Sequence, residues 1–253
     1  MFLEERLEKI LKIINEKDRL TVKEASILLG VSNDTVRRDI IKLVNKNLVM
    51  RTHGGIVSKS NILFDPALEE RVIEHKEDKE KIAMQASSMI NDSEVIILNA
   101  GTTTERIVKY LSNVKNITVL TNALNIAINT IRYNDIKTII IGGNVRKRNL
   151  SIIGPDSINM IKNYHAKKLF IGISAISIER GLMTPNRMEA EINSELLKIA
   201  EKVIVVTDSS KIGSMSLYSF GKIDDIDVII TDKNADEGFL AELKNRNKEV
   251  IIA

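Results

Sequence analysis

Apolar residues follow two different patterns along the chain, and the change between them divides it into two parts. In the first 45 residues they lie three or four positions apart with charged residues between them, which is the period of amphipathic helices. From residue 94 onward they form short, nearly continuous runs of Ile and Val, which are typical of buried β-strands. The length of 253 residues exceeds the usual size of one domain, so two domains are expected.

Three amphipathic helices are predicted in the first part. The inner face of the first helix carries Leu3, Leu7, Ile10, Leu11 and Ile14. The second helix begins with a capping box between Thr21 and Glu24, and Gly30 is placed to terminate it. Ser32 is a good N-cap for the third helix, which runs to Val44 and buries one face of Ile, Leu and Val side chains.

The outer face of the third helix is suited to DNA. It carries short hydrogen-bonding side chains beside two adjacent arginines, at Asn33, Asp34, Thr35, Arg37 and Arg38. Arginine grips guanine edges or phosphates, and asparagine pairs with adenine, when the first turns of a helix enter the major groove. A solvated face of an ordinary surface helix is the alternative interpretation.

The neighbouring segments favour DNA binding. Two short helices joined by a turn at Gly30 predict a helix-turn-helix. Beyond it, two β-prone runs flank His53, Gly54 and Gly55, where the glycines supply the positive φ that a hairpin turn needs. In this small wing, Arg51 and His53 are candidates for contacts with backbone phosphates, although a hairpin that only closes the small core is equally consistent with His53.

Charge and composition narrow the class of protein. The formal net charge is +3, and residues 1–58 account for it with 11 Lys or Arg against 8 Asp or Glu, a distribution typical of a nucleic-acid-binding segment on a neutral body. The lack of cysteine excludes disulfides and thiolate chemistry, and the three histidines are too far apart in sequence to suggest a metal site. Without a membrane-length apolar run or a signal peptide, a cytoplasmic location with no membrane partner is expected.

Residues 1–57 resemble the winged helix-turn-helix of the DeoR family of bacterial transcriptional regulators. The matching residues are Arg6, Ile10, Ile14, Ser32, Thr35, Val36, Arg37, Arg38, Asp39, Ile40 and the run 51–55. The resemblance implies sequence-specific binding to double-stranded operator DNA, usually repression, and release by a phosphorylated sugar. The residues expected to contact DNA are Ser32, Asn33, Thr35, Arg37, Arg38, Arg51 and His53.

A linker and an α/β domain are predicted after the wing. Residues 58–77 lack a clean period and contain Pro66, which predicts a linker with at most one short helical turn. Residues 78–253 contain seven Ile- and Val-rich runs separated by helical or loop segments, which predicts a mostly parallel α/β sheet. Ligands of such sheets bind beyond the carboxyl ends of the strands, so the informative residues should follow these runs.

Glycines, hydroxyls and one lysine follow the predicted strands. Gly101 precedes Thr102, Thr103 and Thr104, where a glycine admits a ligand to the backbone while hydroxyls and a helix N-terminus cradle a phosphate. An ordinary capped helix start is the alternative. The other candidates for effector binding from these junctions are Asn122, Gly142, Gly143, Asp208 and Lys211. Since Lys211 would bring a cation to the same edge of the sheet, we expect a sugar-phosphate site.

The DeoR resemblance continues through residues 101–104, 121–127, 142–146, 170–172, 189–190 and 208–213. It adds Glu189 to the effector-binding residues and implies a fold similar to ribose-5-phosphate isomerase, in which the equivalent Gly-Thr loop holds phosphate. Two positions depart from the family pattern. Asn99 stands where an acid is usual, which weakens an expected hydroxyl contact to the sugar. Residues 172–175 lack the acid of a Gly-Ala-Asp-Gly run, a position at which the isomerases keep catalytic acids.

Two other functions are weighed against a DNA-binding regulator. A sugar-phosphate isomerase could use Asp208, Glu189 and Lys211 for acid–base chemistry, but the missing acid near Ser174 and the DNA-binding segment disfavour it. A redox sensor that binds a dinucleotide would need a Gly-x-Gly-x-x-Gly turn, and the chain has none. We therefore expect a regulator without a cofactor or catalytic residues. Because a helix-turn-helix reads two half-sites, a homodimer or homotetramer is expected.

Overall fold

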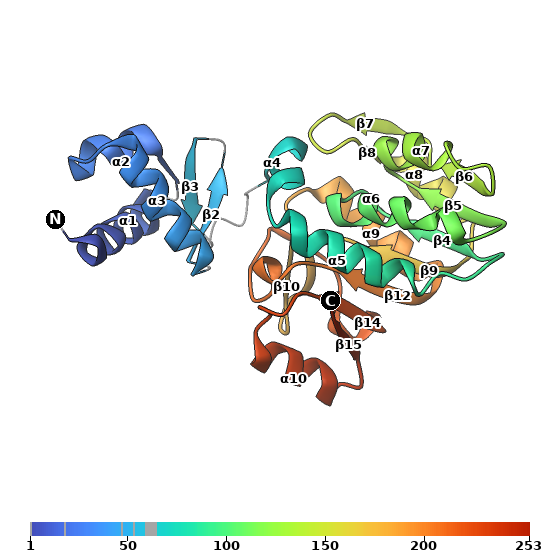
Figure 1. Ribbon diagram of the computed structural model, residues 1–253. Helices are drawn as coiled ribbons and strands as arrows, with labels where there is room; N and C mark the ends of the chain where they lie inside the picture. Colours follow the sequence, from blue (N-terminus) through green and yellow to red (C-terminus); the bar gives the residue numbers. More distant parts are fainter. Residues whose placement is uncertain (1, 18, 47, 53, 59–64) are drawn as a thin grey trace. The chain divides into compact units, whose positions relative to one another are not determined.

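The computed structural model describes residues 2–17, 19–46, 48–52, 54–58 and 65–253. The chain divides into two compact units, Met1–Pro66 and Ala67–Ala253 (Figure 1). The first unit combines helices with a small antiparallel sheet, and the second is built on a parallel sheet. Each unit has its own apolar core, so they are described in turn.

The first unit is a helix-turn-helix with a three-stranded sheet. Its elements are α1 (Leu3–Lys17), β1 (Arg19–Thr21), α2 (Val22–Leu29), α3 (Asn33–Asn45), β2 (Val49–Thr52) and β3 (Gly55–Ser58). Thr21 and Glu24 form the predicted capping box, and Gly30 ends α2 with a left-handed φ of 65°. Ser32 caps α3 by accepting a hydrogen bond from the Thr35 N–H. The three predicted helices are thereby confirmed, as are the predicted caps at Thr21, Gly30 and Ser32.

The small sheet has the strand order β1-β3-β2, and its pairs are antiparallel. The hydrophobic pattern does not predict β1, because three residues are too few to show an alternation. At Gly55, a Cβ atom would lie 2.2 Å from the Leu20 carbonyl oxygen, so the close approach of β3 to β1 requires glycine. Ile10, Leu20 and Ile56 are buried between the sheet and the helices.

The central sheet of the second unit consists of seven parallel strands within the described residues 65–253. In sheet order they are β15 (Glu249–Ile252), β14 (Val228–Thr231), β12 (Ala200–Val206), β9 (Ala166–Ile171), β4 (Val95–Leu98), β5 (Ile117–Thr121) and β6 (Ile136–Ile140). Each strand coincides with one of the seven predicted Ile- and Val-rich runs. The predicted fold class is therefore confirmed.

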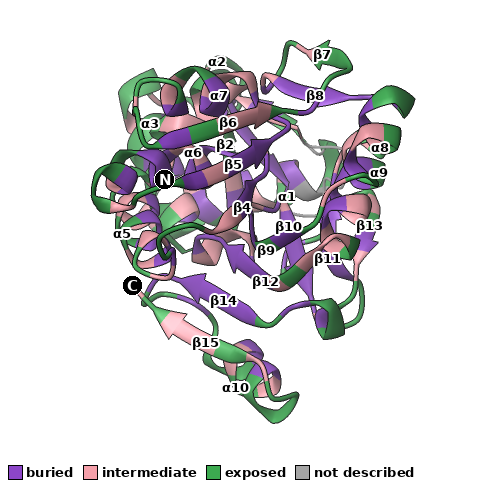
Figure 2. Ribbon diagram, turned by 90° about the vertical axis from the view of Figure 1, so that its right-hand side faces the viewer, coloured by how far each residue is buried: buried purple, intermediate pink, exposed green. Residues whose placement is uncertain are grey.

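Helices cover both faces of this sheet (Figure 2). They are α4 (Leu68–Ile73), α5 (Lys76–Ser87), α6 (Thr102–Ile107), α7 (Leu124–Thr130), α8 (Pro155–Ile161), α9 (Arg187–Lys198) and α10 (Glu237–Asn245), with short 3-10 turns η1 (Val108–Asn113), η2 (Ser209–Lys211) and η3 (Ile223–Asp225). Successive strand residues alternate between two apolar clusters. Ile97 belongs to the cluster with α8, α9 and α10, whereas Ile96 and Leu98 belong to the cluster with α5, α6 and α7. Burial on both faces explains the continuous apolar runs.

Two smaller sheets lie outside the hydrophobic pattern. One has the order β10 (Ala175–Ser177), β11 (Gly181–Thr184), β13 (Tyr218–Gly221), and the other pairs β7 (Asn144–Arg146) with β8 (Ser151–Ile153). These strands have only three or four residues each, so no run of Ile and Val marks them. They nevertheless supply walls of the site described below.

The structure differs from the predicted linker, residues 58–77, at both ends of that segment. Ser58 ends β3, where it pairs with Val49. Residues 67–77 lie in the second unit, which begins at Ala67 rather than at residue 78. The sequence predicts at most one short helical turn here, and the structure has α4, whose side chains are not fully buried and so give no clear apolar periodicity. Polar contacts of its backbone also hold it.

The strand order reverses direction between β4 and β9. From β4 the chain proceeds outward through β5 to β6, then returns to β9 and proceeds the other way through β12, β14 and β15. In parallel sheets, ligands bind at such a switch point, beyond the carboxyl ends of the strands. Asn99 and Ala100 follow β4, and Gly172 follows β9, so these residues mark the expected place of a ligand site.

Candidate functional site

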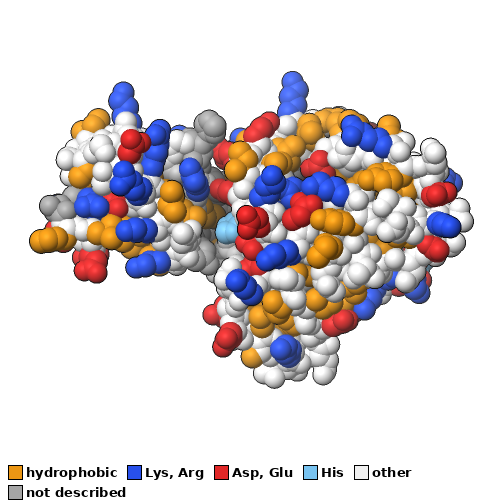
Figure 3. Space-filling view, in the orientation of Figure 1, with side chains coloured by type: hydrophobic (Ala, Val, Ile, Leu, Met, Phe, Trp, Pro, Cys, Tyr) orange, Lys and Arg blue, Asp and Glu red, His pale blue; other side chains and the backbone are white. Residues whose placement is uncertain are grey.

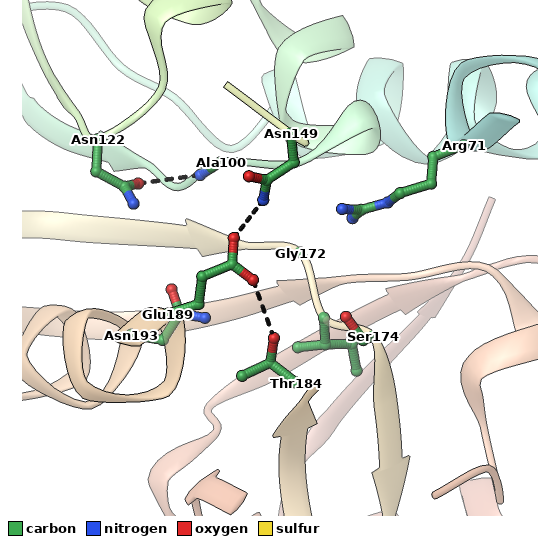
Figure 4. Close-up of a pocket in the computed structure, with 10 residues that line it drawn as sticks. Arg71, Ala100, Asn122, Asn149, Gly172, Ser174, Thr184, Glu189 and Asn193 are labelled. Atoms are coloured by element: carbon green, nitrogen blue, oxygen red, sulfur yellow. Dashed lines mark hydrogen bonds between the residues drawn. The ribbon is translucent and has the colours of Figure 1, made fainter. Parts of the chain in front are cut away.

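A polar pocket lies at the switch point of the sheet (Figure 4). It is lined by Arg71, Ala100, Asn122, Asn149, Gly172, Ile173, Ser174, Thr184, Glu189 and Asn193. These residues come from α4, from the ends of β4, β5 and β9, from the turn between β7 and β8, from β11 and from α9. Amides, hydroxyls, one carboxylate and one guanidinium make a lining suited to a polar ligand.

The Glu189 carboxylate is held in one orientation by neighbouring donors. Its Oε1 accepts hydrogen bonds from Asn149 Nδ2, from Ser151 Oγ at 2.9 Å and from Arg146 at 3.4 Å. Its Oε2 accepts from Thr184 Oγ1 at 3.2 Å. Figure 4 shows the carboxylate between Asn149 and Thr184. The site therefore presents a fixed negative group, which suits recognition of hydroxyl groups.

Asn99 joins the two central strands at the switch point. Its Oδ1 accepts from the Gly172 N–H at 2.8 Å, while its Nδ2 donates to the Gly172 carbonyl at 3.1 Å and to Asn193 Oδ1 at 3.4 Å. An ionised aspartate has no donor for the latter two bonds. Asn99, which replaces the acid usual in the family, therefore has a structural role. Its amide binds the backbone of Gly172 and does not line the pocket.

Asn122 connects β5 to the loop after β4. Its Oδ1 accepts from the Ala100 N–H at 3.0 Å, and its Nδ2 donates to the Ile152 carbonyl at 3.4 Å. Asn122 and Glu189 are the two sequence-predicted effector residues that line the pocket. Their contacts bring together strand ends that are distant in the chain.

The Gly101–Thr104 loop adjoins the pocket through Ala100, although none of its four residues lines it. The three threonines are buried. Thr104 Oγ1 lies 2.8 Å from the Asn99 carbonyl and 2.9 Å from the Gly101 carbonyl, so this hydroxyl is engaged by the backbone. A Cβ atom at Gly101 would lie 2.8 Å from Thr104 Oγ1, which accounts for the glycine.

Asp208 and Lys211 belong to a charged cluster that does not line the pocket. The Asp208 carboxylate accepts from Ser210 N–H at 3.2 Å and from Ser210 Oγ. Burial alone would raise the pKa of Asp208, but Lys211, Lys79 and His75 outweigh it and hold the pKa at about 2. Asp208 is therefore a buried anion that the positive charges of Lys211 and Lys79 stabilise.

Lys79 is the buried cation of this cluster. Its Nζ donates to the carbonyls of Arg71 at 2.7 Å and Glu74 at 2.8 Å. Burial lowers the pKa of Lys79 to about 8, although Asp208 opposes the shift, and burial raises the pKa of Glu74. The cluster is thus linked to α4, whose Arg71 side chain reaches the pocket.

Gly142 and Gly143 have a packing role in the described structure and do not line the pocket. Ser157 Oγ donates to the Gly142 carbonyl at 2.7 Å. Gly143 has a φ of 146°, and a Cβ atom there would lie 2.2 Å from Ser157 Oγ. These glycines allow α8 to approach the turn between β6 and β7.

The hydrophobic pattern and the motifs do not indicate Arg71, Asn149, Thr184 or Asn193. Arg71 lies in the segment predicted as a linker, and Thr184 lies on a strand without an apolar run. Asn193 follows Glu189 by four residues on α9, which places both side chains on one helix face. That spacing is the one signal from which Asn193 could have been inferred.

The recognition helix α3 presents its predicted DNA contacts outward. Asn33, Arg37 and Arg38 are exposed, and Arg37 pairs with Asp34 at 3.1 Å. Ser32 Oγ and Thr35 Oγ1 lie 2.9 Å apart at the start of the helix. Figure 3 shows several Lys and Arg side chains on the visible face of the first unit. This surface has the groups that recognise bases and phosphates.

Asp39 and Arg6 have a structural role on the opposite side of α3. Asp39 is buried, and its carboxylate accepts two hydrogen bonds from Arg6, at 2.7 and 3.1 Å. The pair joins α1 to α3. In the wing, Arg51 is exposed on β2, whereas His53 lies outside the described residues.

Other kinds of site find no support in the described part of the chain. No helix there is long and apolar enough to cross a membrane. Nor do the His, Asp and Glu side chains of the described ranges form a group of three or more that could hold a metal ion.

Comparisons with known proteins agree on one family. Residues 6–61 match the DeoR-like helix-turn-helix domain, and residues 74–233 match the DeoR C terminal sensor domain. The HTH-type transcriptional repressor GlcR of Bacillus subtilis is 32% identical over 252 residues, covering 100% of this chain and 97% of that protein. A putative aga operon transcriptional repressor of Escherichia coli O157:H7 is 31% identical over 250 residues, covering 98% and 93%.

A solved structure of ribose 5-phosphate isomerase A from Methanocaldococcus jannaschii aligns with a TM-score of 0.40 and 16% identity, over 55% of each chain. The family matches confirm the predicted resemblance and the regulatory function, and they exclude the isomerase alternative, because the matched relatives are transcriptional regulators. The chain therefore belongs to the DeoR family of DNA-binding transcriptional regulators, with an N-terminal helix-turn-helix domain and a C-terminal sensor domain.

Proposed function

We propose that this regulator represses genes of sugar metabolism and leaves its operator when a phosphorylated sugar binds at the switch point of the sensor domain. The observation that carries this proposal is the lining of the pocket. The fixed carboxylate of Glu189 and the amides of Asn122, Asn149 and Asn193 suit several hydroxyl groups, and Arg71 adds a guanidinium. The relatives GlcR and the aga operon protein are named repressors, which supports the direction of regulation.

The phosphoryl group is assigned to the Gly101–Thr104 loop and Lys211, with Arg71 as a further cation. The loop begins α6 and offers backbone N–H groups, but it brings no full charge. A phosphoryl group carries close to two negative charges, so cations supply most of the attraction. Lys211 interacts electrostatically with Glu74 and Asp208, in the cluster that holds the backbone of Arg71 through Lys79.

The operator is assigned to the outer face of α3. Asn33, Arg37 and Arg38 are exposed there, and Ser32 and Thr35 lie at its first turn. Arg51 of the wing is exposed as well, which suits a contact with a backbone phosphate. His53 is assigned a phosphate contact as well, on the basis of its place in the sequence of the wing. Reading two half-sites favours a homodimer or homotetramer, and access to the chromosome favours a cytoplasmic location.

The test is release of bound operator DNA during titration with phosphorylated sugars, comparing the wild type with Lys211→Ala. The variant is expected to bind operator normally and to need about ten- to a hundredfold more sugar phosphate for release, because a lost charged hydrogen bond is worth about 1.5–3 kcal/mol. An effector shifts the DNA-binding equilibrium only by its differential affinity for the two states, so weaker binding means weaker release. Thr103→Val is expected to show a milder defect.

Lys198→Ala is the matched control. Lys198 is an exposed lysine on α9 that pairs with Glu195 at 2.7 Å, and its removal should leave release unchanged. If Lys211→Ala releases operator at the same concentration of sugar phosphate as the wild type, Lys211 does not bind the phosphoryl group. Sedimentation of the protein with and without operator DNA would test the even-numbered assembly.

A further inference from the structure

Helix α4 is attached to the sensor domain through its backbone carbonyls. None of its side chains is fully buried, and Leu68 and Val72 are only half-buried, so apolar packing fixes its position only in part. The last carbonyl groups of a helix have no partner within it. Here they accept hydrogen bonds from two buried cations: Lys79 of α5 donates to Arg71 and Glu74, and Arg106 of α6 donates to Val72 at 3.0 Å.

Arg106 contacts three helices with one guanidinium. Its NH2 group holds the Val72 carbonyl of α4, and its Nε lies 3.3 Å from Glu80 Oε2 of α5. Its NH1 group donates to the Thr102 carbonyl one turn earlier in α6, at 3.4 Å, which anchors the guanidinium on its own helix. The side chain is 7% exposed. A buried cation with this set of partners fixes the distance between α4 and α6.

We propose that Arg106 is a positioning residue for ligand binding, which holds α4 so that the Arg71 side chain faces the pocket. Arg71 immediately precedes Val72, so a shift of the held carbonyl displaces Arg71 as well. Arg71 is the only Lys or Arg among the described residues that line the pocket. Arg106 itself does not line it and acts through α4. The inference rests on the proposed function of the pocket.

Lys109 provides a matched control on the same acid. Its Nζ lies 3.0 Å from Glu80 Oε1 and is largely exposed, and no contact joins it to α4 within the described structure. Lys109→Gln therefore removes a positive charge from beside Glu80 without releasing the Val72 carbonyl. Comparison with Arg106→Gln separates the loss of charge near Glu80 from the loss of the contact with α4.

The first experiment is a double-mutant cycle in the full-length chain, with glucose 6-phosphate and inorganic phosphate as calorimetric probes. Arg71→Gln and Arg106→Gln are each expected to weaken binding of glucose 6-phosphate about tenfold, and Lys109→Gln to leave it unchanged. Because Arg106 acts through Arg71, the double variant should bind no more weakly than Arg71→Gln alone. Losses that add in the double variant would overturn the proposal.

The second experiment measures hydrogen exchange of the backbone amides of residues 68–74 without ligand. Exchange should be faster in Arg106→Gln than in the wild type or Lys109→Gln, because α4 opens more readily when its carbonyl contact is lost. Arg106→Lys, which keeps a charge but fewer donors, should recover part of the protection and serves if Arg106→Gln does not fold. Unchanged exchange in both Arg106 variants would overturn the proposal, whatever their affinities.

The two experiments distinguish this inference from the proposed function. If the wild type binds neither probe, the assignment of the pocket to phosphorylated ligands of this kind fails. The exchange of residues 68–74 then still decides whether Arg106 fixes α4. If the wild type binds glucose 6-phosphate and Arg106→Gln binds it equally well, the pocket assignment stands and the positioning role is overturned.

Discussion

Asn99 illustrates how one buried amide can set the geometry of a pocket. It engages both the N–H and the carbonyl of Gly172, so the ends of β4 and β9 are held together where the strand order reverses. Its remaining contact reaches Asn193, which lines the pocket. The residue that departs from the family pattern is therefore part of the support beneath the pocket.

Asn99→Asp should destabilise the sensor domain. An ionised carboxylate keeps the acceptor for the Gly172 N–H but faces the Gly172 carbonyl and Asn193 Oδ1 without a donor. Leaving buried polar groups unsatisfied costs about 1–3 kcal/mol. Urea denaturation would measure the loss, and Asn163→Asp, at an exposed side chain, should be near neutral. Equal stability of both variants would show that Asn99 is not a structural amide.

Asp208 should make the stability of the sensor domain depend on acid pH. Its folded pKa of about 2 lies below the usual value of 3.8, so the ionised group stabilises the fold above about pH 4, and this stabilisation is lost as the pH falls toward 2. Between pH 5 and pH 2 the loss is about 2 kcal/mol. Urea denaturation across this range should show the loss in the wild type and a smaller one in Asp208→Asn. Parallel pH dependence in the two proteins would contradict the buried, cation-stabilised carboxylate.

Helix α3 divides its polar residues between two tasks. Asp39 faces inward and joins Arg6 of α1, whereas Arg37 and Arg38 face solvent. The outward arginines contribute no buried contact to the fold, so their substitution should affect DNA binding without changing the stability of the domain.

Arg37→Ala and Arg38→Ala should each weaken operator binding by about 1–3 kcal/mol where the arginine contacts a base. Where the arginine contacts a phosphate, the substitution should instead reduce the salt slope, which is the slope of log affinity against log salt concentration, by about one. Fluorescence titration of operator DNA at several salt concentrations distinguishes the two cases. Lys12→Ala, on the exposed face of α1, is the control with the same change of charge. If both arginine variants bind operator with the affinity and salt slope of the wild type, the assignment of DNA recognition to the outer face of α3 is wrong.

Elements that bury an apolar face could be predicted from the sequence, and those held by polar contacts could not. The face that begins at Val36 predicts α3, and the continuous apolar runs predict every strand from β4 to β15 that lies in the parallel sheet. Helix α4 is anticipated only as a short helical turn, because the hydrogen bonds from Lys79 and Arg106 to its carbonyls do not appear in the hydrophobic pattern.

The candidate site is predictable only in part for the same reason. Asn122 follows an apolar strand and could be found, while Asn149 and Thr184 lie beside or on short strands with no such pattern. Asn99 is visible in the sequence, but its role depends on β9, which is far away in the chain and adjacent in the sheet. The local hydrophobic period of a sequence does not reveal which strands become neighbours in the sheet.

At the scale of the whole molecule, the place where the sensor domain begins determines whether it is stable alone. The segment 67–253 should fold as an isolated domain, because its two apolar clusters lie within it. The segment 78–253 lacks the carbonyls of Arg71, Val72 and Glu74, so buried Lys79 and Arg106 lose partners.

The shorter segment should therefore unfold at a temperature lower by several degrees, as is usual for a loss of 1–3 kcal/mol in a domain of about 180 residues. Thermal denaturation of the two segments followed by circular dichroism measures the difference. Equal midpoints would place the functional boundary of the domain at residue 78, as its hydrophobic pattern suggests.

The reversal of strand order between β4 and β9 also sets the sequence of events as the protein is synthesised. Strands β4, β5 and β6 leave the ribosome first and can pair with one another, but the other edge of β4 stays open until β9 has been made. The last lining residue of the pocket, Asn193, follows later still. A nascent chain thus contains its complete helix-turn-helix unit well before the pocket of its sensor domain is complete.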